Sequence, residues 1–102
     1  MRRRVPETDY RASRICRVLG NPTAYQIIKL LSKQAKRPME LAAELGVSIQ
    51  TVSDALGKLR NIDLVRYEVR TDGRTYWLKH RAIIKILLML ERLVQYIRFQ
   101  TW

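Results

Sequence analysis

The chain has 102 residues and a formal net charge of +11, from 20 Lys and Arg against 9 Asp and Glu. This is the length of one small domain, which buries about 60 to 70% of the surface of its unfolded chain, so a partner chain would stabilise it considerably. The charge excludes cationic ligands and makes nucleic acid or an anionic membrane surface the expected partner. The single cysteine excludes an internal disulfide and a multi-cysteine zinc site, which favours a reducing cytoplasm.

Fourteen of the basic residues are Arg, which favours bidentate contacts to phosphate and guanine, although a hot or GC-rich source would also enrich Arg. The basic start of the chain is not followed by the apolar segment of a secretory signal. The most hydrophobic stretch, AIIKILLML, is too short to span a membrane and contains Lys85. We therefore expect a soluble cytoplasmic protein.

Two helices are predicted in the first third of the chain, after a flexible basic arm over residues 1–6 and within a single domain over residues 7–102. The first covers residues 7–19 and is ended by the sequence Gly-Asn-Pro, and the second begins at Pro22 or Thr23. Their apolar sides contain Ala12, Ile15, Cys16, Val18 and Leu19 in the first helix, and Ala24, Ile27, Ile28 and Leu31 in the second.

Two further short helices with a tight turn between them are predicted over residues 38–60. Leu41, Ala42 and Leu45 form the apolar stripe of the first of them. Gly46 follows as a residue that can take a positive φ at a helix C-terminus, so this helix is expected to end near Leu45.

The second helix of this pair is predicted to begin after Ser48, whose hydroxyl suits an N-cap. Val52, Leu56 and Leu59 recur at i, i+4 and i+7 and form its core face. Its other face carries short polar side chains that can reach base edges and phosphates, namely Gln50, Thr51, Ser53, Asp54 and Lys58. The alternative is that these are only capping and solvated positions, but a helix that only packs has little use for so many small hydrogen-bonding groups.

A two-stranded hairpin is predicted over residues 64–79, where the apolar period changes to two and Asp72-Gly73 supplies a turn. Such a hairpin is marginal alone and must pack on helices. Tyr76 and Leu78 are expected to face inward with Val65, Tyr67 and Val69 or their neighbours, and Trp77 is expected on the opposite face.

A last helix is predicted over residues 81–99, and its apolar stripe is wider than the roughly 100° arc that a surface helix needs. An exposed patch of that size would aggregate, so another chain is expected to cover it.

The segment ELAAELGVSIQTVSDALGKLRNIDLV resembles the helix-turn-helix of the ArsR/SmtB-type winged-helix repressors. Two flanking segments match in the same order: LGNPTAYQIIKLL resembles the family's Leu-Gly-x-Pro-Thr helix start, and DGRTYWL resembles its wing. The resemblance covers about residues 19–78 of the chain. It implies a mainly α fold, a winged helix-turn-helix with about five helices and one two-stranded hairpin in the order α-α-α-α-β-β-α. It also implies that the domain dimerises through its first and last helices.

The resemblance and the polar faces together indicate which residues would contact DNA. They also indicate which residues would contact a second copy of the chain. The predicted DNA-binding residues are Ser48, Gln50, Thr51, Ser53, Asp54, Lys58, Arg60, Arg70 and Arg74. Lys36 and Arg37 are weaker candidates for phosphate contacts. The predicted dimer-interface residues are Ala12, Ile15, Cys16, Leu19, Ile83, Leu87, Leu90, Val94 and Ile97.

The chain departs from the family pattern at four positions. Asp54 and Ala55 stand where many relatives have basic or His residues, and Asp63 replaces the usual turn glycine. Gly57 weakens the helix interior by up to about 1 kcal/mol relative to Ala. Asp54 either accepts a hydrogen bond from cytosine N4 or points away from the phosphates, so the base preference of relatives does not transfer.

Metal sensing is the best-known property of this family, and a pair of cysteines in the first helix of the helix-turn-helix often provides it. That helix reads MELAAEL here, without cysteine, while His80 and Glu91 in the last helix are about 16 Å apart along the axis. We therefore expect no metal, no cofactor and no small-molecule ligand. Cys16 is expected to be a small buried hydrophobe, and the alternative is a redox switch.

Catalysis is not expected, because His80 has no evident orienting partner and the chain has no Gly-rich phosphate loop and no paired carboxylates. The chain is predicted to be a sequence-specific transcriptional regulator at the nucleoid, binding double-stranded DNA as a homodimer on a roughly palindromic operator without responding to metals. Two alternatives remain: an abundant nonspecific DNA-coating or architectural protein, and a protein-interaction module that docks through the apolar last helix. A membrane-surface role is least favoured, because the basic residues are spread over all elements.

Overall fold

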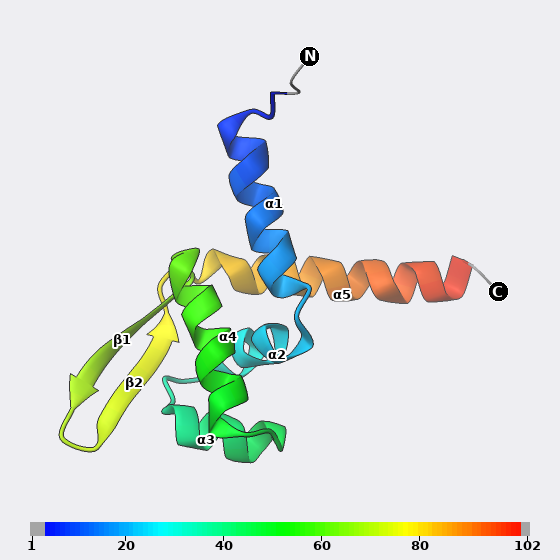
Figure 1. The fold of residues 1–102 in the computed structure, drawn as a ribbon. Coiled ribbons are helices and arrows are strands. Elements are labelled where there is room, and N and C mark those ends of the chain that lie inside the picture. Colours follow the sequence, from blue (N-terminus) through cyan, green and yellow to red (C-terminus); the bar gives the residue numbers. More distant parts are fainter. Residues whose placement is uncertain (1–3, 101–102) are drawn as a thin grey trace.

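A computed structural model of the chain describes residues 4–100 as five helices and one two-stranded antiparallel sheet (Figure 1). The elements are α1 (Glu7–Leu19), α2 (Pro22–Leu31), α3 (Pro38–Leu45), α4 (Ile49–Asn61), β1 (Val65–Arg70), β2 (Gly73–Leu78) and α5 (Ala82–Gln100). The predicted order α-α-α-α-β-β-α is confirmed. The predicted arm over residues 1–6 lies partly outside the described residues.

Local sequence signals set the ends of the central helices. The Asn21 side chain caps α2 by accepting a hydrogen bond from the Ala24 N–H at 3.0 Å. Gly46 ends α3 with φ 68°, in the left-handed region that favours glycine. Ser48 Oγ accepts from the Thr51 N–H at 3.0 Å and starts α4. The predicted glycine stop and serine cap are both confirmed, so the turn between α3 and α4 is encoded within three residues.

The core lies where α2, α3 and α4 pack together beneath the base of the hairpin (Figure 1). The apolar stripes predicted for α2 and α4 are buried as expected, because their i, i+4 spacing places them on one side of each helix. The largest fully buried side chains are Ile27, Ile28, Leu31, Leu41, Val52, Leu56, Leu59 and Val65.

The hairpin is anchored at its base and exposed toward its tip. Val65 pairs with Leu78, and both side chains are buried. Val69 pairs with Arg74 near the tip and is 73% exposed, so the prediction that Val69 faces the core is wrong. Strand alternation gives Val69 the inward side, but the hairpin extends beyond the helices that would cover it (Figure 1).

Lys36 fastens the segment before α3 to the hairpin. Its backbone N–H and C=O exchange hydrogen bonds with Tyr76 at 3.0 and 2.8 Å, which adds a bridge residue to the edge of β2. Its side chain is buried and its ammonium pairs with Glu44 at 2.9 Å. The expectation that Lys36 contacts phosphate is therefore corrected, since this charge is already neutralised inside the protomer.

Helix α1 contacts the core mainly through its C-terminal end. Leu19 is buried and Ile15 and Val18 pack partly against the core, while the rest of the helix projects away (Figure 1). Cys16 is exposed, so the prediction of a small buried hydrophobe is wrong for the protomer. It lies on the predicted apolar side of the helix, with Ala12 and Ile15, but the helix has no packing partner at that position within residues 4–100.

Helix α5 is held by its N-terminal half and by one polar cluster. Tyr25 donates to Glu91 Oε2 at 2.7 Å and Lys29 donates to Glu91 Oε1 at 3.1 Å, which fixes α5 to α2. Beyond Leu87 its apolar side chains are solvent-exposed in the protomer. The exposed large apolar residues of α5 are Ile86, Leu88, Met89, Leu90, Leu93, Val94, Tyr96, Ile97 and Phe99.

The residues predicted for a dimer interface fall into three groups by their burial in the protomer. Leu19, Ile83 and Leu87 are buried in the protomer core and therefore cannot be surface for a second copy. Ile15 is half-buried. The exposed members are Ala12, Cys16, Leu90, Val94 and Ile97.

The free energy of unfolding is expected to fall as the pH drops below 4.5, partly through Glu91. Hydrogen bonds from Tyr25 and then from Lys29 hold the pKa of Glu91 below its ordinary value of 4.5. A carboxyl group with a depressed folded-state pKa contributes stability that is complete above the unfolded pKa and is lost as the pH falls through the folded pKa. Burial and the Glu91 contact raise the pKa of Tyr25 to about 12, so the phenol remains a donor throughout.

Urea unfolding at about pH 7 and about pH 4 tests this expectation. Glu91→Gln should make the loss of stability at the lower pH smaller than in the unaltered protein. A pH dependence of the same steepness in both proteins would assign it to other carboxyl groups, of which Glu40 and Asp63 also have lowered pKa values.

Candidate nucleic-acid interface

Helix α4 has one buried face and one exposed polar face. Val52, Leu56 and Leu59 are completely buried. The predicted contact residues Ser48, Gln50, Thr51, Ser53, Asp54, Lys58 and Arg60 are all exposed. Ala55 is 4% exposed and belongs to the core, so its difference from basic or His residues in relatives does not alter the exposed face.

The exposed polar side chains at the start of α4 form hydrogen bonds with one another. Ser48 Oγ and Thr51 Oγ1 lie 2.8 Å apart and share a hydrogen bond. Gln50 Nε2 donates to Asp54 Oδ1 at 2.8 Å, an i, i+4 pair along the helix. Sequence analysis expected Asp54 either to accept from cytosine N4 or to point away from the phosphates. Neither alternative included this hydrogen bond from Gln50 within the helix. The pair leaves the Gln50 carbonyl oxygen and one amide N–H available to a base edge.

The charged residues of the hairpin differ in how far they are neutralised. Arg70 forms an ion pair with Glu68, with Nε 2.6 Å from Oε1. Asp72 at the turn pairs with Arg37 at 2.9 Å, which ties the wing tip to the start of α3. Arg37 also pairs with Glu40, so both of its acidic partners compete with any phosphate. Sequence analysis predicted both Arg70 and Arg74 as DNA-binding residues. In the structure Arg70 has a carboxylate partner, whereas Arg74 has none among residues 4–100.

Arg74 and Arg60 meet at one aromatic ring. The guanidinium carbon of Arg74 lies 4.3 Å from the ring centroid of Tyr67, and that of Arg60 lies 5.0 Å from it. Tyr67 in turn packs on Tyr76 with 5.1 Å between ring centroids. A hydrogen bond with Tyr76, and then the two tyrosines' electrostatic effect, raise the pKa of Arg74 above its ordinary value. The structure therefore joins the end of α4 to the wing through Tyr67, a residue that sequence reasoning assigned only to packing.

A second polar cluster lies at the other end of the hairpin. Asp63 takes φ 65° in the turn before β1, which is the conformation that the family's glycine would adopt without strain. Its carboxylate pairs with Lys79 and lies 3.6 Å from His80 Nε2. The Lys79 hydrogen bond holds the pKa of Asp63 below its ordinary value. His80 thus has a partner that the sequence did not reveal, but both groups are more than half exposed, so the pair is not an enclosed acid–base site.

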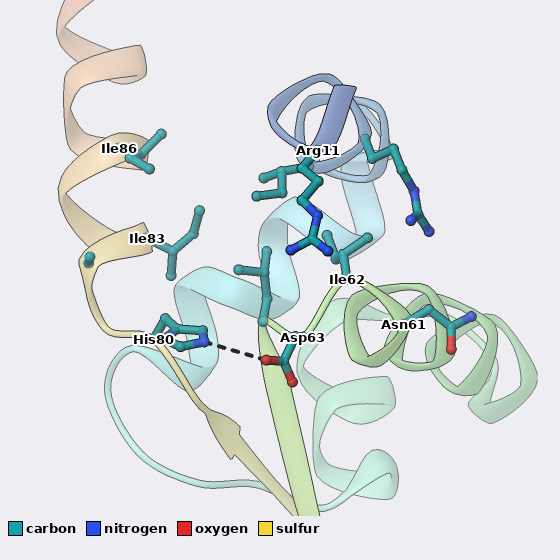
Figure 2. A pocket seen from close by; sticks show the side chains of 11 residues that line it. Arg11, Asn61, Ile62, Asp63, His80, Ile83 and Ile86 are labelled. Atoms are coloured by element: carbon teal, nitrogen blue, oxygen red, sulfur yellow. Dashed lines mark ion pairs between the residues drawn. The ribbon is translucent and has the colours of Figure 1, made fainter. Parts of the chain in front are cut away.

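Figure 2 shows this pair at the edge of a cavity of about 550 Å³. Arg11 from α1 points into it from one side, Ile83 and Ile86 from α5 line another, and Ile62 and Asp63 form its floor. The cavity lies between α1 and α5, the two helices that extend from the core. It is therefore on the side where other elements do not cover these helices.

Neither a metal cluster nor a membrane helix occurs in the part of the chain that the structure describes. No group of three His, Cys, Asp or Glu residues among residues 4–100 is placed to hold an ion. Within the same residues, none of the helices is long and apolar enough to cross a membrane.

The comparisons with known proteins agree with this geometry. The family model described as "Bacterial regulatory protein, arsR family" matches residues 21–67, which include α2, the helix-turn-helix and the first part of β1. The chain therefore has a winged helix-turn-helix fold, and the matched segment resembles the ArsR family. No curated protein sequence matches it.

Several solved structures share this winged helix-turn-helix fold along nearly their whole length. NolR from Sinorhizobium fredii is 26% identical, with 91% of this chain and 96% of NolR covered and a TM-score of 0.77. Rv0081 from M. tuberculosis is 19% identical, with 96% and 98% covered and a TM-score of 0.82. A DNA-binding domain from Mycobacterium bovis, described as a homodimeric winged helix-turn-helix of a possible ArsR-family transcriptional regulator, is 17% identical, with 100% and 96% covered and a TM-score of 0.76.

Proposed function

We propose that this ArsR-type protein is a transcriptional regulator that binds double-stranded DNA sequence-specifically as a homodimer, at the nucleoid of the cytoplasm. The observation that carries the proposal is the exposed polar face of α4, next to a wing whose Arg74 has no carboxylate partner among residues 4–100. A basic domain with a net charge of +11 supplies the nonspecific attraction to DNA, and Gln50, Thr51 and Ser53 supply donors and acceptors for base edges.

The homodimer is proposed from the exposed apolar side of α5. A row of Ile86, Leu90, Leu93 and Ile97 follows the i, i+4, i+7, i+11 spacing of one helix side, and each is at least 40% exposed in the protomer. The Mycobacterium bovis domain is described as homodimeric, and this chain covers 96% of it. A two-fold dimer would present two copies of α4, so the operator is proposed to be roughly palindromic, with half-sites about 10 base pairs apart or a multiple of that.

Selection of bound sequences from random DNA by the purified protein tests the proposal. An enriched palindrome is the expected result. Enrichment of no sequence, with equal competition by random and promoter DNA, would instead identify a nonspecific DNA-coating protein. Affinity for the selected site should fall steeply between about 50 and about 200 mM salt, because binding releases counterions from the neutralised phosphates.

DNA binding is also proposed to be independent of metal ions. The support is the composition of α3, PMELAAEL, which lacks the cysteine pair that thiolate-binding metals require. Affinity for the selected site should be the same in chelator and in added zinc. A change in affinity that follows zinc concentration and is reversed by chelator would contradict the proposal.

Substitutions at Ser48 should separate its role as a helix cap from its contact with DNA. Ser48→Ala is expected to lower the free energy of unfolding by about 1 kcal/mol, because the Thr51 N–H loses its acceptor. Asp and Asn are both good caps, so Ser48→Asp and Ser48→Asn should keep the stability. Only Ser48→Asp places a negative charge at the proposed DNA surface, and it should bind DNA more weakly than Ser48→Asn in a fluorescence-anisotropy titration. Equal affinities would place Ser48 away from the phosphates.

A further inference from the structure

The geometry points to a phosphate clamp in which Tyr67 holds Arg60 of the recognition helix and Arg74 of the wing together for one stretch of the DNA backbone. This inference rests on the proposed DNA-binding function and adds a positioning residue to it. Its starting observation is that both guanidinium groups lie over the same ring, at 5.0 Å for Arg60 and 4.3 Å for Arg74.

The charges at this ring are unbalanced. Within residues 4–100, neither Arg60 nor Arg74 has a carboxylate within ion-pair distance, whereas Arg11 and Arg70 each have one and Arg37 has two. Two like charges beside one ring repel each other, and the negative face of the tyrosine offsets only part of that cost. An anion between them would remove the repulsion, and guanidinium groups are well matched to phosphate oxygens.

The space next to the ring suits such an anion. Arg60 and Tyr67 line a cleft of about 360 Å³ together with Asp63, Val65 and Arg66. The one carboxylate in that lining, Asp63, is already paired with Lys79, so the arginines of the lining leave the cleft positive. Arg74 stacks on the same Tyr67 ring but does not line the cleft itself. The exposed Arg66 is the second guanidinium group of this lining, beside Arg60.

Tyr67 is suited to position the arginines because its own ring is fixed. It is half-buried, pairs with Tyr76 across the hairpin and packs on the Tyr76 ring at 5.1 Å. The backbone of Tyr76 is itself bound to Lys36 on the other edge of β2. A guanidinium group stacked on a fixed ring loses less rotamer freedom when it binds phosphate than a free one, so stacking should increase affinity without adding a contact to DNA.

A double-mutant cycle with a fluorescein-labelled random-sequence duplex tests the clamp. Tyr67→Leu is expected to weaken binding about tenfold at low salt, within the range of coupling between neighbouring residues. Tyr67→Phe keeps the aromatic face and should bind within about twofold of the unaltered protein. In an Arg60→Ala/Arg74→Ala background, Tyr67→Leu should change affinity by less than about twofold, because nothing remains for the ring to position.

Two further outcomes complete the test. An equal loss from Tyr67→Leu in both backgrounds would show that Tyr67 only supports the hairpin, and would overturn the clamp. Arg60→Ala/Arg74→Ala should also lower the slope of log affinity against log salt by about 2 per protomer, and an unchanged slope would likewise overturn it. If the unaltered protein bound neither this duplex nor the selected operator, the proposed function itself would fail, which distinguishes the two failures.

Discussion

Replacing Leu93 with Glu is expected to make the protein monomeric and to weaken operator binding by on the order of 100-fold. Leu93 is 51% exposed in the protomer and lies in the row of apolar side chains on α5. In a two-fold dimer the substitution would place two carboxylates in an apolar interface, where each loses its hydration without gaining a partner. A monomer engages one half-site, so it loses the gain in affinity that comes from linking two.

Sedimentation analysis and anisotropy titration of the same samples measure the two effects together. Gln95→Glu is the matched control, because it adds the same charge to an exposed position of α5 about 200° further around the helix. It should remain dimeric and bind the operator within about twofold, as expected for a surface substitution outside the interface. A Leu93→Glu protein that stays dimeric would show that the dimer interface lies elsewhere. A monomeric Leu93→Glu protein with full affinity would show that operator binding does not require the dimer.

Leu56→Ala is expected to lower the free energy of unfolding by about 2 to 5 kcal/mol, the largest effect on stability of any substitution considered. Leu56 has no exposed surface and packs at the centre of the core, between α4 and the helices behind it. Truncation removes buried apolar surface and leaves a cavity that the surrounding helices fill only in part. A loss of this size is a large fraction of the stability of a small domain.

The matched substitution on the same helix is Ser53→Ala, which lies on the exposed face. It should leave the free energy of unfolding within about 0.5 kcal/mol, yet weaken binding to the selected operator. Urea unfolding with an unchanged m value checks the stability of both proteins, and titration under conditions where each is folded checks their affinity. If Ser53→Ala bound DNA normally while Leu56→Ala lost affinity in the folded state, the two faces of α4 would have been assigned in reverse.

Features that depend on neighbours in the sequence were predicted well. The order of the elements, the glycine stop at Gly46 and the serine cap at Ser48 each depend on a few consecutive residues. The Arg70–Glu68 pair could also have been found, since residues two apart on a strand share a face. Because Glu68 neutralises Arg70, this spacing would have shown that Arg70 is less available to DNA than Arg74.

Features that depend on residues far apart in the sequence were missed. Cys16 and Val69 lie on the apolar sides of their elements, but neither element is covered at that position within the described protomer. Lys36 was assigned to the surface because of its charge, and only its contacts with Glu44 and Tyr76 show why it is buried. Periodicity predicts which side of an element is apolar, while the length over which that side is covered depends on where the other elements lie.

The sequence by itself determined the helix-turn-helix, because its caps, its glycine turn and its i, i+4 apolar spacing are local properties of residues 38–60. Only the tertiary structure decided which charges on the proposed DNA surface are free. Arg60 and Arg74 are fourteen residues apart in the sequence and share the ring of Tyr67, whereas Arg37 and Asp72, which are thirty-five residues apart, neutralise each other. Such pairings depend on where the folded chain places β1 and β2 against α3 and α4, and no periodicity in the sequence encodes that distance.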